Sequence, residues 1–198
     1  MTQEHANIAL TGFMAAGKTV VGRRLARSLG WSFVDLDAVI ESGEGSAVRE
    51  IFAVRGEGYF REREKAALAH VLEETGQVIA LGGGAVVDPD NRARLKERSL
   101  LIWLKVSPGT VLHRTRGDEE RPLLQQGGKA AHDGNAVASG DGAPSVSPAA
   151  ADAAKLGRIE ELLAQREQIY AEADMTVDTD NLAVDQVVQR IQQRLCRP

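Results

Sequence analysis

Apolar residues occur along this chain in two alternating patterns. Short apolar runs predict five strands, at residues 7–10, 31–37, 77–84, 100–106 and 174–179. Apolar residues at helical spacing predict helices between and after them, at 20–29, 46–74, 88–99, 107–115, 156–173 and 181–195. Within 46–74 the sequence "RGEG" predicts a break, and Gly30 is expected to end the first helix. The helix at 88–99 is expected to be capped by Asp88, and the helix at 107–115 is also expected to be capped.

Strands that alternate with helices and read as continuous apolar runs are typical of a parallel sheet covered on both faces. The fold class is therefore α/β. One segment, Gln125 to Lys155, differs in kind: it is rich in Gly, Ala, Ser and Asp and contains only two valines as sizeable apolar residues. Such a composition predicts a mobile loop. We expect a single domain over 1–198, with a lid and flexible insertion at about 116–155.

Composition and charge narrow the class of protein. Hydrophobic residues make up 43% of the 198 residues and charged residues 26%, as in ordinary globular proteins. The net charge of −4 argues against broad binding to nucleic acid or anionic membranes. Cys196 is the only cysteine, and the sequence contains neither a recognisable secretory signal nor a long apolar span. We expect a cytoplasmic protein, a monomer, with no nucleic-acid or membrane partner.

The sequence "GFMAAGKT", residues 12–19, has the spacing of a phosphate-binding loop between a strand and a helix. Its glycines allow backbone N–H groups to surround a phosphate, and the helix that follows adds its positive end. Lys18 would contact the terminal phosphates, and the Thr19 hydroxyl would bind Mg²⁺. An ordinary glycine-rich turn is the alternative. The flanking strand and helix favour a nucleoside triphosphate site.

The phosphate acceptor has its own candidate residues. Asp35 and Asp37 are expected at the end of the second strand, pointing the same way, one near Mg²⁺ and the other as a base. A pair of solvated or helix-capping aspartates is the alternative. Arg61, one helical turn before Glu64, would hold an anion, although a surface salt bridge would look the same.

The three consecutive glycines 82–84 after a strand indicate close approach of a ligand or another backbone. Arg121 and Arg166 lie before and after the flexible segment. Each alone is typical of a solvated side chain, but together with the phosphate loop they predict a cationic pocket for a small acid. The chain lacks the Asn-Lys-x-Asp signal of guanine-specific switches and is short for a motor ATPase, which favours a small phosphotransferase.

The sequences "GFMAAGKT", "DLD", "YFRERE", "LGGGA", "RPLL" and "AQREQIY" resemble, in order and spacing, the shikimate kinase family of P-loop proteins. The resemblance covers 8–195 apart from the insertion. It implies a three-layer fold of the P-loop kinase type, with a five-stranded parallel sheet, helices on both faces and an extended lid loop. It also implies transfer of the γ-phosphate of ATP to the 3-hydroxyl of shikimate, in aromatic amino-acid biosynthesis.

The resemblance assigns roles by position. Catalysis would rest on Lys18, Asp37 and Arg121, and Mg²⁺ would be held by Thr19 and Asp35. Shikimate would be bound by Asp37, Arg61, Gly82, Gly83, Gly84 and Arg166. The nucleotide would be bound by Gly12, Ala15, Ala16, Gly17, Lys18, Thr19, Val20, Arg114 and Arg121.

The chain departs from the family at Ala15, where glycine is usual, at Leu36, where threonine is usual, and in the long lid. Two other functions stay open. One is a P-loop kinase acting on gluconate, a nucleotide or adenylyl sulfate. The other is a nucleotide-binding protein that has lost turnover.

Overall fold

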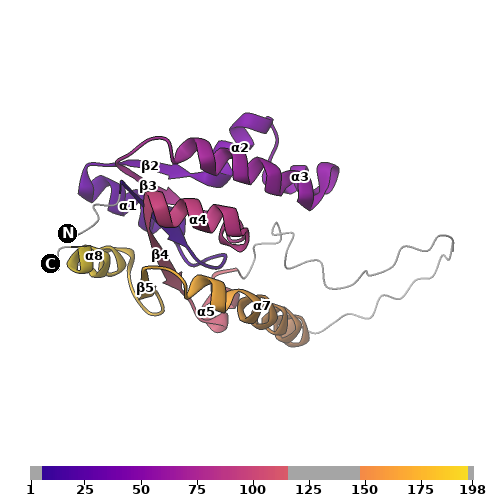
Figure 1. Ribbon diagram of the computed structural model, residues 1–198. Coiled ribbons are helices and arrows are strands. Elements are labelled where there is room, and N and C mark those ends of the chain that lie inside the picture. The colour runs from indigo at the N-terminus through magenta and orange to yellow at the C-terminus, as the bar shows by residue number, and fades with distance from the viewer. Residues whose placement is uncertain (1–5, 116–147, 196–198) are drawn as a thin grey trace.

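The computed structural model describes residues 6–115 and 148–195 (Figure 1). It contains one five-stranded sheet in the order β2-β3-β1-β4-β5, and every neighbouring pair is parallel. The strands are β1 (Asn7–Thr11), β2 (Ser32–Asp35), β3 (Gln77–Ala80), β4 (Ser99–Lys105) and β5 (Met175–Asp178). The predicted five-stranded parallel sheet is confirmed.

Helices cover both faces of the sheet, which confirms the predicted three layers. The first half of the chain supplies α1 (Lys18–Leu29), α2 (Leu36–Glu44), α3 (Val48–Val71), the short 3-10 helix η1 (Ala85–Val87) and α4 (Pro89–Arg98). The second half supplies α5 (Pro108–Arg114), α7 (Pro148–Tyr170) and α8 (Val184–Leu195). In Figure 1, α2 and α3 lie above the strands, and α7 and α8 lie below them.

Two apolar clusters form the core, one on each face of the sheet. Side chains of β1 alternate between them: Ile8 and Leu10 pack with α1 and α8, whereas Ala9 packs with α2, α3 and α4. All three side chains are buried, as expected for a central parallel strand. The carboxyl end of β1 is consequently held firmly where the phosphate-binding loop begins.

Several local predictions are confirmed by the backbone. Gly30 ends α1 in the left-handed conformation, and Ser107 and Asp88 cap α5 and α4 through side-chain hydrogen bonds. The expected break in the long helix lies at Gly56, whose φ of 81° and ψ of 170° interrupt α3. Glycine is required there because other residues rarely adopt such angles.

Three predictions of element bounds were wrong. The second strand, predicted over 31–37, ends at Asp35, and the third, predicted over 77–84, ends at Ala80. Residues 36–44 form the helix α2, which the pattern did not indicate. Leu36 and Ile40 lie one turn apart and are buried, so tertiary packing decides this short helix.

The third error concerns the segment 125–155, which was expected to be a loop throughout. Its last residues are helical, because α7 begins at Pro148. Residues 149–151 and 153–154 are alanines, the best helix formers, and the Lys155 Nζ donates to the Thr115 carbonyl at 2.8 Å. Residues 116–147, with the predicted lid and Arg121, lie outside the described residues, as does Cys196.

Candidate active site

The phosphate-binding loop connects β1 to α1 through backbone conformations that favour glycine. Gly12 has a φ of 139°, and a Cβ there would lie 2.5 Å from the Leu104 carbonyl oxygen. Gly17 has a φ of 93° and caps α1. Ala15 also adopts a positive φ, 59°, although it carries a side chain. The loop therefore has the fold that its sequence predicts, with one strained position.

Lys18 and Thr19 begin α1, where the positive end of the helix dipole favours an anion. The Lys18 Nζ donates to the carbonyls of Gly12 at 2.8 Å and Phe13 at 3.0 Å, so the side chain folds back over the loop. The Thr19 hydroxyl donates to Asp35 Oδ2 at 2.9 Å. The two predicted magnesium ligands thus lie side by side.

One cavity of about 760 Å³ joins this loop to the predicted acceptor site. A volume of this size suits two small ligands or one larger one. Its lining includes every predicted site residue in the described part of the chain except Gly12. These residues are Ala15, Ala16, Gly17, Lys18, Thr19, Val20, Asp35, Asp37, Arg61, Gly82, Gly83, Gly84, Arg114 and Arg166.

Asp37 reaches the cavity in a different way from the one predicted. Asp35 is the last residue of β2 and Asp37 lies in the first turn of α2, so the alternation of a strand does not align them. Burial raises the pKa of Asp37, and the nearby Asp35 raises it further, while Lys18 lowers it. A carboxylate with a raised pKa is a stronger proton acceptor once ionised, as a general base requires.

Arg61 is held between two glutamates of its own helix. Its Nη1 donates to Glu64 Oε2 at 2.7 Å, and its Nε and Nη2 donate to Glu57 Oε1 at 3.3 and 3.0 Å. The Glu64 side chain is only 1% exposed, whereas that of Glu57 is 64% exposed. Glu64 therefore fixes the guanidinium from inside the protein, as its spacing in the sequence predicted.

Glu64 also has a polar atom without a partner. Among the described residues, nothing hydrogen-bonds to its buried Oε1. Burial raises the pKa of Glu64, and Asp37 and Asp88 add to this, whereas Arg61 lowers it. The Glu64 carboxyl group therefore lies close enough to Asp37 for the charge of Asp37 to raise its pKa.

The glycine triplet lies where these side chains converge. A Cβ at Gly82 would lie 2.8 Å from Glu64 Oε1 and 2.9 Å from Asp37 Oδ1. At Gly84 it would lie 2.6 Å from Arg61 Nη2. These distances are shorter than a carbon atom tolerates, so two of the three glycines are required by the packing of functional side chains.

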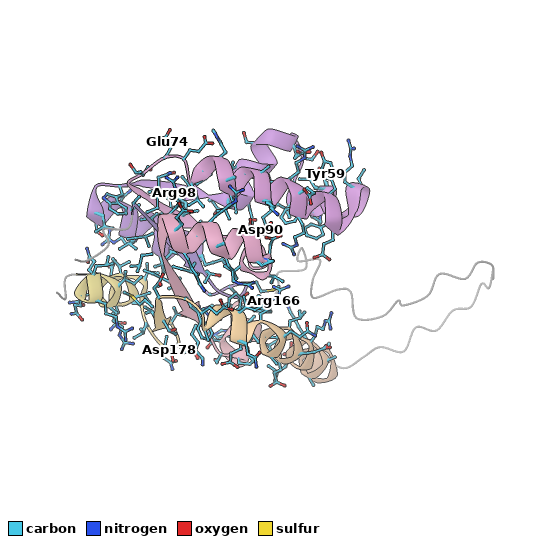
Figure 2. All side chains as sticks on the ribbon, in the orientation of Figure 1. Tyr59, Glu74, Asp90, Arg98, Arg166 and Asp178 are labelled. Carbon is cyan, nitrogen blue, oxygen red and sulfur yellow. The ribbon has the colours of Figure 1, made fainter. Side chains whose placement is uncertain are left out.

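Arg114 and Arg166 reach the cavity from α5 and α7. Arg114 donates to the Ala15 carbonyl at 2.9 Å, which ties it to the phosphate-binding loop. Arg166 donates to the Gly83 carbonyl at 3.3 Å. In Figure 2, Arg166 lies on the side of α7 that is turned towards α4. The two arginines thus lie near opposite parts of the site.

Sequence reasoning missed three groups at the site. Phe52 and Phe60 line the cavity and stack at 4.5 Å between ring centroids, giving it an apolar wall next to Arg61. Tyr170 donates to Gly83 at 2.7 Å, and its position one turn after Arg166 could have indicated it. Leu36, by contrast, is fully buried in the core and does not line the cavity, so this departure from the family lies outside the site.

Two features are absent from the described residues. These residues contain no helix long and apolar enough to cross a membrane. They also contain no group of three or more His, Cys, Asp or Glu side chains that could hold a metal. A magnesium ion bound by Thr19 and Asp35 would therefore need further oxygen ligands from phosphate and water, which is usual for this ion.

Comparisons with known proteins agree with the geometry. The sequence is 42% identical to a shikimate kinase of Moorella thermoacetica over 189 residues, covering 96% of this chain and 94% of the relative. It is 36% identical to the shikimate kinase of Persephonella marina, with 96% and 98% covered.

Solved structures lead to the same family. Shikimate kinase from Acinetobacter baumannii in complex with shikimate superposes with a TM-score of 0.79 at 34% identity, covering 97% of this chain and 93% of that one. A gluconokinase from Sinorhizobium meliloti superposes with a TM-score of 0.52 at 15% identity, with 96% and 95% covered, which shows a common fold alone. The shikimate kinase sequence profile matches residues 14–196, and the chain belongs to the shikimate kinase family.

Proposed function

We propose that this chain transfers the γ-phosphate of ATP to the 3-hydroxyl of shikimate, giving shikimate 3-phosphate and ADP. Members of its family are ATP-dependent kinases with a hydroxyl acceptor. The observation that carries the proposal is the single cavity lined both by the phosphate-binding loop and by Asp37, Arg61 and Arg166. Such a cavity brings donor and acceptor together, which is the main requirement of phosphoryl transfer.

The residues on the donor side fit ATP and Mg²⁺. The backbone of 15–19 would surround the phosphates, Lys18 would contact the terminal ones, and Arg114 would lie beside the adenine. Thr19 and Asp35 supply the hard oxygen atoms that Mg²⁺ prefers, at 2.9 Å from one another. A bound Mg²⁺ neutralises negative charge on the phosphates during transfer. The expected contribution of Arg121 from the lid stays a prediction.

On the acceptor side, two arginines line the same cavity. Arg61 and Arg166 would hold the carboxylate of shikimate, and Gly82, Gly83 and Gly84 would lie against its ring. Both arginines line the cavity, and Gly83 bonds directly to Arg166. A guanidinium binds a carboxylate through parallel hydrogen bonds, which would orient the acid in one way only.

Asp37 would bind the acceptor hydroxyl and remove its proton as the oxygen attacks phosphorus. Its raised pKa favours this role, because the proton is held more firmly by Asp37 than by an exposed aspartate. Lys18 lowers the same pKa, because its positive charge favours the ionised form of Asp37. Proton acceptance and phosphate binding are thus coupled through neighbouring charges.

A coupled assay of ADP release with ATP, Mg²⁺ and shikimate tests the function. We expect turnover by the wild type and none above background for Lys18→Ala, which removes the phosphate contact but lies outside the apolar core. Gluconate and nucleoside monophosphates serve as alternative acceptors. Faster turnover with one of these than with shikimate would refute the proposed acceptor.

A further inference from the structure

Tyr170, the last residue of α7, connects this helix to the glycine triplet. Its hydroxyl donates to the Gly83 carbonyl at 2.7 Å, and its side chain is fully buried. The ring packs in the core against Trp103 of β4, with 5.8 Å between ring centroids. A buried tyrosine needs a partner for its hydroxyl, and here the partner belongs to the candidate acceptor site.

The Gly83 carbonyl is held differently from those of its two neighbours. The Gly82 and Gly84 carbonyls accept from backbone N–H groups of Ala85 and Val87, at 3.1 and 2.9 Å, within the same short turn. The Gly83 carbonyl instead accepts from two side chains of α7, Tyr170 and Arg166. The middle peptide of the triplet therefore depends on α7 for its orientation.

The shorter of these two bonds belongs to Tyr170, at 2.7 Å against 3.3 Å for Arg166. Burial raises the pKa of Tyr170, which keeps the hydroxyl protonated as a donor, although the nearby Arg166 lowers this pKa. Arg166 would have to share its donors between Gly83 and a bound carboxylate. The Tyr170 hydroxyl oxygen also accepts a hydrogen bond from Arg166, so this one hydroxyl contacts both the Gly83 carbonyl and the guanidinium.

A fixed Gly83 carbonyl also fixes the next N–H group. Because the peptide unit is planar and trans, the Gly83 carbonyl and the Gly84 N–H point in opposite directions. Rotation of this peptide would move Gly84 as well, and a side-chain atom at Gly84 would lie within 2.6 Å of Arg61. Because Gly84 packs this closely against the Arg61 guanidinium, the Tyr170 bond to this peptide bears on both arginines.

We propose that Tyr170 is a positioning residue for the acceptor: its hydroxyl sets the Gly83 peptide and orients Arg166 to bind the carboxylate of the substrate. This inference rests on the proposed function, because it takes shikimate as that substrate. Tyr170 does not line the cavity and is given no direct contact with the acid. Its effect passes through Gly83 and Arg166.

The substitution Tyr170→Phe tests this role, because it removes the hydroxyl and keeps the ring against Trp103. We expect the KM for shikimate to rise about tenfold, as for the loss of one buried hydrogen bond. The KM for ATP should stay within about twofold, since the Tyr170 hydroxyl donates to Gly83 and not to a residue of the phosphate-binding loop. Calorimetry with shikimate alone should show the same loss of affinity.

Tyr59→Phe is the matched control. The Tyr59 hydroxyl donates to Glu44 Oε2 at the same distance, 2.7 Å, but Tyr59 does not line the cavity and joins α3 to α2. We expect this variant to keep both KM values. If the loss of any tyrosine hydroxyl raised the KM for shikimate, both variants would show the same rise. That result would overturn the proposal.

Wild-type turnover in the same assay separates the two conclusions. An inactive wild type with shikimate would refute the proposed function itself. An active wild type, with an unchanged shikimate KM in Tyr170→Phe, would refute the positioning role alone. A fall in melting temperature with equal changes in both KM values would likewise show that Tyr170 only stabilises the fold.

Discussion

Gly84→Ala is the substitution for which the structure gives the most specific outcome. The new Cβ would lie 2.6, 2.7 and 2.9 Å from Nη2, Nη1 and Cζ of Arg61. Non-bonded carbon atoms prefer separations of about 3.5–4.0 Å, so the guanidinium must move by roughly 1 Å. Gly84 has a φ of −108°, which alanine adopts without strain, and the methyl group is thus the only cause of the change.

Displacement of Arg61 should weaken the binding of the acid more than the binding of ATP. A hydrogen bond to a charged group contributes about 1.5–3 kcal/mol, or roughly a 10- to 150-fold change in affinity. We expect the KM for shikimate to rise about 10- to 100-fold, while the KM for ATP changes little. Steady-state kinetics with each substrate varied in turn measures both quantities.

Gly58→Ala is a control on the helix that carries Arg61. A Cβ at Gly58 would meet nothing within 4 Å, and alanine favours a helix over glycine by about 0.5–1 kcal/mol. This variant should be slightly more stable than the wild type and have the same kinetic constants. A folded Gly84→Ala protein with an unchanged shikimate KM would refute the assignment of Arg61 to the acid.

Three further predictions concern the other parts of the site. Asp37→Asn should lower kcat by at least about 100-fold and leave ATP affinity, measured by calorimetry, nearly unchanged; full activity would exclude Asp37 as the base. Ala15→Gly should raise the free energy of unfolding by about 0.5–1 kcal/mol in urea, because the positive φ of Ala15 costs more than the added freedom of glycine in the unfolded chain. Glu64→Gln should remove a pH dependence of the free energy of unfolding. The folded-state pKa of Glu64 lies above its ordinary value of 4.5, so the folded wild type binds this proton more firmly than the unfolded chain does. The wild type should therefore lose stability as the pH rises from about 4.5 through the folded-state pKa. Parallel unfolding curves of wild type and Glu64→Gln across that range would contradict the raised pKa.

The sequence predicted the parts of the fold that depend on local rules. The spacing of residues 12–19 between a strand and a helix indicated the phosphate-binding loop, and Glu64 one turn after Arg61 indicated their ion pair. The break near Gly56 and the caps of α4 and α5 were predictable in the same way, because glycine, proline and serine determine the backbone conformation over only a few residues. The resemblance to a family then supplied the acceptor.

Features that depend on distant contacts were beyond such rules. Asp37 was assigned to a strand because α2 is short, and burial of Leu36 and Ile40 by the rest of the fold decides that helix. Tyr170 meets Gly83 across 87 positions of the chain; its spacing from Arg166 indicates a shared helix face, but no periodicity shows which distant residue it contacts. The strand order, which puts β1 at the centre, is likewise set by packing of the whole domain.

Some expectations stay predictions. The described residues do not test a monomeric state, a cytoplasmic location, or the role of Arg121. Size-exclusion chromatography with light scattering would measure the first of these, and Arg121→Ala in the kinetic assay would measure the last. A fall in kcat with folding intact is the result expected for a lid arginine that stabilises charge on the transferred phosphoryl group.

If donor and acceptor meet in one cavity, a crystal structure with shikimate, Mg²⁺ and a non-hydrolysable ATP analogue should show both there. We expect the 3-hydroxyl oxygen within about 3–3.5 Å of the γ-phosphorus, with the carboxylate against Arg61 and Arg166. Shikimate bound outside this cavity, or with its carboxylate in contact with neither arginine, would contradict this expectation.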